Sequence, residues 1–247
     1  MDENIRHLSL NDTFSFSCSK DLSCFNNCCM ALNQYLTPYD ILCIKNHLQI
    51  SSDIFLKKYT TEHFGPESGL PVITFKVDMN NQLKCPFLTS SGCGIYEARP
   101  TSCRMYPLAR GVSRSRDTGD VIVHYALFNE SHCTGGEQEK IWTIKAWLID
   151  QELEVYNQIN DMLLEIISLK NRLLPGMLDI KSKMAFSLAC YNLDNFRKQI
   201  FEQDLLKNFN LDPDTLEIIR DDDTELLKFG FKWLKQILFN QKNEFEK

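Results

Sequence analysis

Cysteine is the residue that most constrains what this chain can fold into. The sequence has ten cysteines in 247 residues, and nine of them fall within the first 133. A chain of this length can bury a core without disulfides to replace it. In a reducing compartment, crowded thiols bind metal or carry out redox chemistry more often than they form disulfides. The cysteines therefore predict a metal or redox site rather than a crosslinked scaffold.

The spacing of the cysteines divides them into a site and a remainder. Soft thiolates select zinc, cuprous copper or iron–sulfur clusters, and four of them complete one tetrahedral zinc or one [4Fe–4S] cube. Eight thiolates therefore supply two four-coordinate sites or one polynuclear cluster. Disulfides or redox exchange, and inert buried thiols, are the alternatives. The eight candidate ligands are Cys18, Cys24, Cys28, Cys29, Cys85, Cys93, Cys103 and Cys133.

Three features of the cysteines need separate treatment. Cys28 and Cys29 are adjacent, and neighbouring side chains diverge. The pair therefore fits best if each thiolate serves a different metal, or if one is a ligand and the other packs. Cys43 lies in a predicted helix and Cys190 is alone in the helical part, so both are expected to be apolar filler, as free cysteines often are.

Residues before and after position 134 differ in character. Glycine, proline and all but one of the cysteines concentrate before it, and helical periodicity dominates after it. We predict an α+β fold: a cysteine-rich metal-binding module with few short strands over residues 14–136. An α-helical region over residues 137–247 follows and is expected to pack on it.

Local patterns place the expected elements. In the first part, capping and apolar spacing predict helices over about 38–48 and 52–59. Strands are expected over 72–77, 83–85 and 121–128, with a turn at 79–82. In the second part, apolar residues at alternating spacings of four and three predict one long helix over 142–174. Further helices are expected over 179–208, from 213 and from 224.

Charge and hydropathy bear on partners and location. The net charge of −6 and a pI near 5.4 argue against a nucleic-acid partner. No run of twenty apolar residues is present, so no membrane partner is expected, and the absence of a secretory pattern favours the cytoplasm. A protein partner is left open. Arg99 and Arg104 flank Cys103 and are expected to balance a thiolate–metal charge or to form structural ion pairs.

Longer motifs carry a family resemblance. They are the stretches 16–29 and 36–40, and Cys85-Pro86-Phe87-Leu88 leading to the segment 92–107, GCGIYEARPTSCRMYP. Over residues 14–136 these segments resemble the YkgJ family of cysteine-cluster proteins, a zinc- or iron-chelating domain related to flagellin lysine N-methylases. The resemblance implies that the eight cysteines are metal ligands, and it leaves the metal open.

Two functions follow as hypotheses. In the first, the cysteines hold zinc or an iron–sulfur cluster in a structural or electron-transfer role. In the second, which rests on the resemblance, the chain is a protein-lysine N-methyltransferase that uses S-adenosylmethionine. The glycine pattern G-x-G-x-x-G is absent, which argues against a doubly wound nucleotide fold. No catalytic residue is assigned, and whether the chain is an enzyme stays open.

Overall fold

The computed structural model describes residues 5–66, 68–78, 80, 82–114, 121–207, 209 and 211–239. The chain forms two compact units, each made from two stretches of sequence. Unit 1 comprises Met1–Leu32 and Val77–Val155, and unit 2 comprises Asn33–Lys76 and Tyr156–Lys247. All eight candidate ligands belong to unit 1, whereas Cys43 and Cys190 belong to unit 2.

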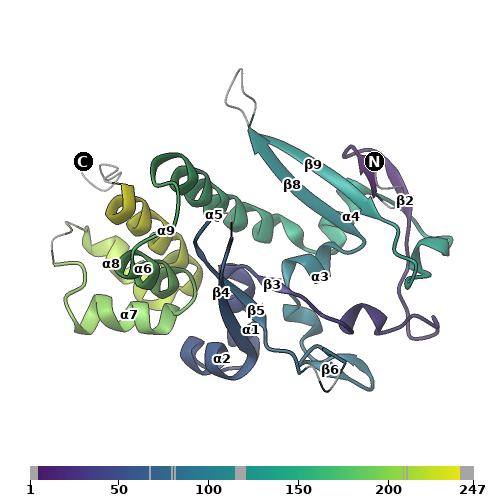
Figure 1. Cartoon of the computed structure of the whole chain (residues 1–247), viewed down its shortest axis with the longest axis horizontal. Coiled ribbons are helices and arrows are strands. Elements are labelled where there is room, and N and C mark those ends of the chain that lie inside the picture. Colours follow the sequence, from purple (N-terminus) through teal and green to yellow (C-terminus); the bar gives the residue numbers. More distant parts are fainter. Residues whose placement is uncertain are drawn as a thin grey trace. The chain divides into compact units, whose positions relative to one another are not determined.

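Unit 1 is built from short strands and short helices. Its helices are α3 (Thr101–Met105), α4 (Ile144–Asp150) and the 3-10 turns η1 (Asn27–Cys29), η3 (Tyr96–Ala98) and η4 (Gly135–Glu137). Its strands are β1 (Ile5–Leu8), β2 (Thr13–Ser15), β6 (Leu88–Thr89), β7 (Gly92–Cys93), β8 (Leu108–Arg114), β9 (Val121–Phe128) and β10 (Ile141–Thr143). An antiparallel sheet has the order β1-β9-β8, and Figure 1 shows β8 and β9 side by side.

An aromatic cluster forms the core of unit 1 beside β2. The Trp147 ring meets Phe14 at 5.8 Å and Phe16 at 5.5 Å between centroids, both edge to face. The indole N–H of Trp147 donates to the Met105 carbonyl at 3.1 Å, and that of Trp142 donates to the Phe16 carbonyl at 3.0 Å. Because buried indoles need such partners, these bonds fix the segment that leads into Cys18.

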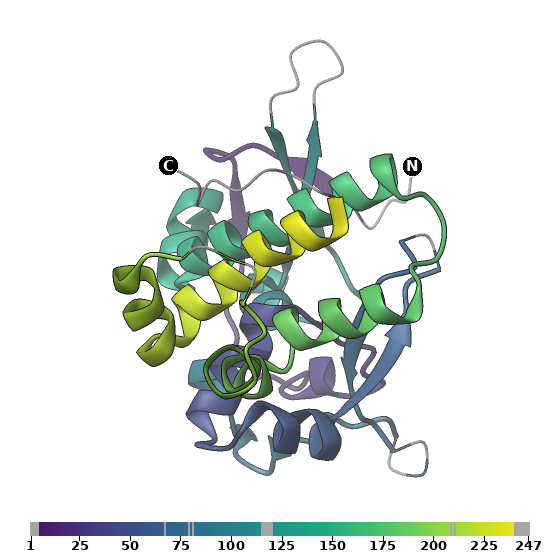
Figure 2. The same cartoon turned by 90° about the vertical axis from the view of Figure 1, so that its left-hand side faces the viewer.

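Unit 2 combines a small sheet with the helices of the C-terminal part. Its elements are β3 (Tyr35–Leu36), β4 (Thr60–Phe64), β5 (Pro71–Phe75), α1 (Pro38–His47), α2 (Ser52–Tyr59), α5 (Leu153–Leu173, whose first residues fall in unit 1), α6 (Ile180–Cys190), α7 (Leu193–Glu202), α8 (Pro213–Asp221) and α9 (Asp223–Phe239). The sheet has the antiparallel order β3-β5-β4. Helix α9, yellow in Figure 2, packs against α6, α7 and α8.

A partly buried ion network holds unit 2 together. The Lys45 ammonium, on a side chain only 5% exposed, lies 2.8 Å from Asp223 and 3.3 Å from Asp194. The Arg197 guanidinium lies 2.6 Å from Asp223. Burial alone would raise the pKa of Asp223, but hydrogen bonds from Lys45 and Arg197 lower it to about 2. The network therefore joins α1, α7 and α9 through charged groups that are paired, as buried charges must be.

The fold class agrees with the sequence prediction: several short strands accompany the cysteines, and the C-terminal part is helical. The two N-terminal helices are confirmed, with Thr37 and Asp40 forming a capping box at the start of α1. Strand β9 covers the predicted residues 121–128. The strand predicted over 72–77 appears as β5, over Pro71–Phe75.

Some predicted elements need correction, and one lies partly outside the described residues. The strand at 83–85 is wrong, because β5 pairs with β3 and β4 instead. The turn at 79–82 includes residues 79 and 81, which lie outside the described residues. The helix predicted over 142–174 is divided into β10, α4 and α5, and Glu152 at the break has a φ of 54°. Arg104 bonds the Gln151 carbonyl at 3.2 Å and stabilises this break.

The helix predicted over 179–208 is likewise divided into α6 and α7. The Ser52 hydroxyl donates to the Asn192 side chain at 2.9 Å, and the Ser52 N–H donates to the Asp194 carboxylate at 2.6 Å. These bonds from α2 compete with helical continuation at residues 191–192. Both breaks thus depend on groups far away in the sequence, which periodicity does not report.

The compact units also differ in layout from the predicted domains, 14–136 and 137–247. Residues 33–76 lie inside the first predicted domain but group with the C-terminal helices. The Tyr191 hydroxyl donates to the Pro71 carbonyl at 3.2 Å, and the Ser187 hydroxyl donates to Glu62 at 2.6 Å. These contacts make β4 and β5 part of the helical unit.

Candidate metal centre

The candidate ligands come from three segments of unit 1 that backbone hydrogen bonds hold together. The first segment leaves β2 and reaches Cys18. The Phe16 N–H donates to the Lys140 carbonyl at 2.9 Å, and the Ser17 N–H donates to the Gly135 carbonyl at 3.0 Å. A Cβ on Gly135 would lie 2.5 Å from the Phe16 ring, so only glycine permits this approach. Cys18 is thereby placed beside the segment that carries Cys133.

Cys24 is held by Thr134, the residue after Cys133. The Thr134 N–H donates to the Cys24 sulfur at 3.4 Å, and the Thr134 hydroxyl oxygen lies 3.2 Å from the same sulfur. Hydrogen bonds from the Thr134 side chain and backbone lower the pKa of Cys24. Two polar contacts from one residue thus stabilise the thiolate form, which is the form that binds metal.

Cys28 and Cys29 lie in η1, where Asn26 precedes them with a φ of 71°. The Cys85 N–H donates to the Cys29 carbonyl at 2.9 Å and joins the second segment to the first. The Leu88 N–H then donates to the Cys85 carbonyl at 3.1 Å. In the β6–β7 hairpin, Leu88 is paired with Cys93. Cys29, Cys85 and Cys93 are therefore connected by consecutive backbone contacts.

Charge interactions and hydrogen bonds between side chains connect seven of the eight candidate thiols. Burial raises the pKa of Cys18, and the charges of Cys28, Cys133 and Cys24 raise it further. A hydrogen bond to Cys29, then burial and the charges of Cys29 and Cys24, raise the pKa of Cys28.

The second segment behaves similarly. Burial raises the pKa of Cys85 to about 11, and the charges of Cys93 and Cys28 act in the same direction. Burial also raises the pKa of Cys93, with the Arg99 guanidinium opposing it. Thiols that repel one another as thiolates are neutralised by a bound cation, so such clustering is typical of metal sites.

The remaining candidate, Cys103, is exposed in α3. Arg104, beside it, is buried and donates to the backbone carbonyls of Glu97, Arg99 and Gln151. Arg99 is also buried and donates to the Tyr96 carbonyl and the Gln151 side chain at 2.6 Å each. Both arginines therefore have structural roles, and Arg99 also acts on the charge of Cys93.

All ten cysteines are free thiols in the structure. Among the described residues, no three side chains of histidine, cysteine, aspartate or glutamate converge closely enough to hold a metal ion. Cys190 is fully buried in α6, and Cys43 is partly buried in α1. Both positions agree with the packing roles predicted for them.

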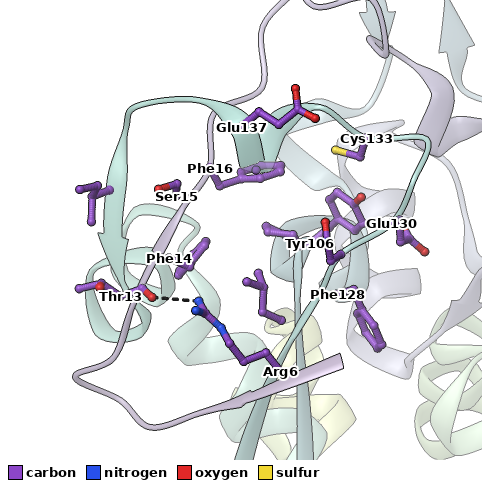
Figure 3. Close-up of a pocket in the computed structure, with 15 residues that line it drawn as sticks. Arg6, Thr13, Phe14, Ser15, Phe16, Tyr106, Phe128, Glu130, Cys133 and Glu137 are labelled. Carbon is purple, nitrogen blue, oxygen red and sulfur yellow. Dashed lines mark hydrogen bonds between the residues drawn. The ribbon is translucent and has the colours of Figure 1, made fainter. Parts of the chain in front are cut away.

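Figure 3 shows a cavity of about 640 Å³ in unit 1 that has Cys133 in its wall. Phe14, Phe16 and Tyr106 line it together with Cys133, and Arg6 reaches in from β1 to donate to the Thr13 carbonyl at 3.1 Å. Solvent therefore has a route to the Cys133 side of the cysteine group.

Tyr106 connects this cavity to the cysteines. Burial raises the pKa of Tyr106, and hydrogen bonds to Cys133 and Glu130 raise it further. His132 lies 3.4 Å from Glu130. Sequence reasoning misses Thr134 and Glu130. Their only sequence signal is proximity to Cys133.

Comparison with known proteins gives one match. Residues 17–134 match the model of a family described as "Putative zinc- or iron-chelating domain". The matched range is close to the predicted range 14–136 and contains all eight candidate ligands. No curated protein and no solved structure matches the chain. Within the described residues, no helix is long and apolar enough to cross a membrane.

Proposed function

We propose that the chain, whose residues 17–134 match the model of a zinc- or iron-chelating family, binds zinc or an iron–sulfur cluster through the eight cysteines of unit 1. One observation carries the proposal. Unit 1 gathers cysteines from three separate segments and omits the two that were predicted to be filler. Packing alone does not require the eight candidate ligands to lie in one unit and the two filler cysteines in the other. A shared metal site does require its ligands to lie in the same unit.

The donor chemistry fits the proposed metals. All eight groups are sulfur donors, which zinc and iron–sulfur clusters prefer. None is committed to a disulfide, and seven interact electrostatically. Bound zinc contributes folding free energy, and a bound cluster supplies one-electron chemistry. The protein supplies Arg99 near Cys93 and the Thr134 hydrogen bonds to Cys24, both of which offset negative charge on sulfur.

The decisive experiment is metal analysis of protein purified without oxygen. Zinc, iron and acid-labile sulfide are measured per chain, together with visible absorption. Stoichiometric zinc in a colourless protein assigns a structural site, and iron with equal sulfide and a broad visible band assigns an electron-transfer cluster. A folded protein that holds neither metal and takes up neither refutes the proposal.

The methyltransferase hypothesis stays a prediction from the resemblance alone. Calorimetric titration with S-adenosylmethionine tests it independently of the metal. Absence of heat at millimolar ligand would remove its support and leave the metal-binding proposal intact.

A further inference from the structure

We propose that Cys24 and Cys133 form a reversible redox site, which hydrogen peroxide or another peroxide crosslinks as a disulfide when no metal occupies the two thiols. Both cysteines are free and partly buried. The inference goes beyond the proposed function, because metal binding and crosslinking are alternative uses of the same two sulfur atoms. It also stands if the chain binds no metal.

The described part of the chain brings thiols together in pairs rather than in larger groups. No three side chains of histidine, cysteine, aspartate or glutamate converge among the residues that the structure describes. The Cys24 and Cys133 side chains are hydrogen-bonded to each other. The Cys28 and Cys29 side chains form a second such pair. A disulfide needs two sulfur atoms that lie close together, so each pair is a candidate for crosslinking.

Backbone geometry selects Cys24 and Cys133 from these two pairs. Consecutive Cα atoms lie about 3.8 Å apart across a trans peptide, whereas a disulfide requires about 4.4–6.8 Å between its Cα atoms. Cys28 and Cys29 are adjacent in the turn η1 and are joined by a trans peptide, so a bridge between them would distort the backbone. Cys24 and Cys133 come from different segments, and their Cα separation is free of this restriction.

Thr134 holds the two members of the selected pair beside each other. Its N–H donates to the Cys24 sulfur at 3.4 Å, and its hydroxyl oxygen lies 3.2 Å from the same sulfur. Cys133 directly precedes Thr134, and the Cys133 N–H donates to the Glu130 carbonyl at 2.9 Å. The two thiols are therefore held in contact, although more than 100 residues separate Cys24 from Thr134.

The cavity in Figure 3 gives an oxidant access to this pair. Cys133 lies in the cavity wall beside Tyr106, whose side chain is hydrogen-bonded to that of Cys133. The cavity volume is about 640 Å³. One water molecule occupies roughly 30 Å³ in the liquid, so a small peroxide fits easily. An oxidant therefore meets Cys133 first, and Cys24 is the thiol in contact with it.

The reaction balances with peroxide as its only co-reactant. The Cys133 thiolate attacks one peroxide oxygen, the O–O bond breaks, and the departing hydroxide takes up the thiol proton to give water and a sulfenic acid. The Cys24 thiolate then attacks the sulfenic sulfur, and the S–S bond forms as a second water leaves. Two thiols and one hydrogen peroxide thus give one disulfide and two waters. A thiol reductant reverses the crosslink by exchange and is itself oxidised to a disulfide.

Peptide mapping of the metal-free wild-type chain tests the site without any variant. The full chain is stripped with a chelator, treated with one equivalent of hydrogen peroxide, blocked with N-ethylmaleimide and digested. Fragmentation mass spectrometry should identify a Cys24–Cys133 crosslink that is two hydrogens lighter than the separate peptides and that dithiothreitol removes. A crosslink from either residue to another cysteine such as Cys18, or the absence of any crosslink, overturns the inference.

Serine variants provide the matched control. Cys24→Ser should lose the crosslink and leave a sulfenic acid at Cys133, which dimedone traps, whereas Cys43→Ser should retain the crosslink. An undiminished crosslink at Cys133 in Cys24→Ser also overturns the inference.

Zinc added before the peroxide separates this inference from the proposed function. Zinc that binds these two thiols should block the crosslink. A crosslink that forms equally fast with zinc present contradicts the ligation of zinc by Cys24 and Cys133, and it supports the redox site.

Discussion

Replacing Arg104 by methionine removes a charged donor from a buried position without a large change in side-chain length. Arg104 is 4% exposed, and it donates to the Arg99 and Gln151 carbonyls at 3.2 Å each and to the Glu97 carbonyl. It also lies 3.6 Å from Glu152, whose side chain is 77% exposed. The substitution therefore strips three backbone acceptors of their donor and breaks one ion pair.

The magnitude follows from those partners. A hydrogen bond from a charged group contributes about 1.5–3 kcal/mol, and a carbonyl left buried without a donor costs about 1–3 kcal/mol. Burying methionine in place of a guanidinium recovers part of this. The exposed ion pair contributes less than about 1 kcal/mol. We expect a net destabilisation of about 3 kcal/mol, which corresponds to about 6–12 °C for a chain of this size.

Urea unfolding followed by circular dichroism measures the effect, and hydrogen exchange of peptides covering 97–105 localises it. Arg6→Met is the matched control, because Arg6 is exposed and bonds one carbonyl at 3.1 Å. It should cost less than about 1 kcal/mol. If the two variants differ by less than about 1 kcal/mol, the three-carbonyl explanation of this segment is wrong.

Three further outcomes are expected. Thr134→Val should weaken zinc binding about tenfold in a competition titration, because the Cys24 sulfur loses its hydroxyl contact; unchanged affinity contradicts this role. Gly230→Ala should cost about 1–3 kcal/mol in urea, because its Cβ would lie 2.7 Å from a carbonyl oxygen of α6, whereas Gly111→Ala, with nothing within 4 Å, should be neutral; equal costs would refute the close approach. Asp223 should contribute about 2 kcal/mol of stability above its ordinary pKa of 3.8, lost as the pH falls towards 2, where its folded pKa lies. The stability difference between wild type and Asp223→Asn should therefore shrink from pH 5 to pH 2, and a constant difference refutes the assignment.

The candidate site can be recognised from the sequence, because a group of so many crowded thiols has few functions other than metal binding or redox chemistry. Their count and crowding, together with the segment 92–107, indicate a metal site from residue identity and spacing alone. The supporting residue Thr134 is not accessible in this way. Its hydroxyl is useful only because folding brings it 3.2 Å from the sulfur of Cys24, and no local pattern encodes that distance.

Helix boundaries show the same limit. Capping residues are local, so the start of α1 at Thr37-Pro38 can be recognised directly. The break after α4 cannot, because it depends on arginines that arrive from residues 99 and 104. The periodicity of apolar residues continues across the break and gives no sign of it.

The sequence by itself determined the donor chemistry that this protein has available: soft thiol groups in a chain with helical C-terminal periodicity. Only the tertiary structure decided which segments belong together. Residues 33–76 leave the cysteine segment and join the helices, because their strands and helices bury apolar faces and paired charges against α6, α7 and α9. The flanking cysteine segments then meet across that excursion through backbone hydrogen bonds. Their partners are set by three-dimensional proximity and not by spacing along the chain.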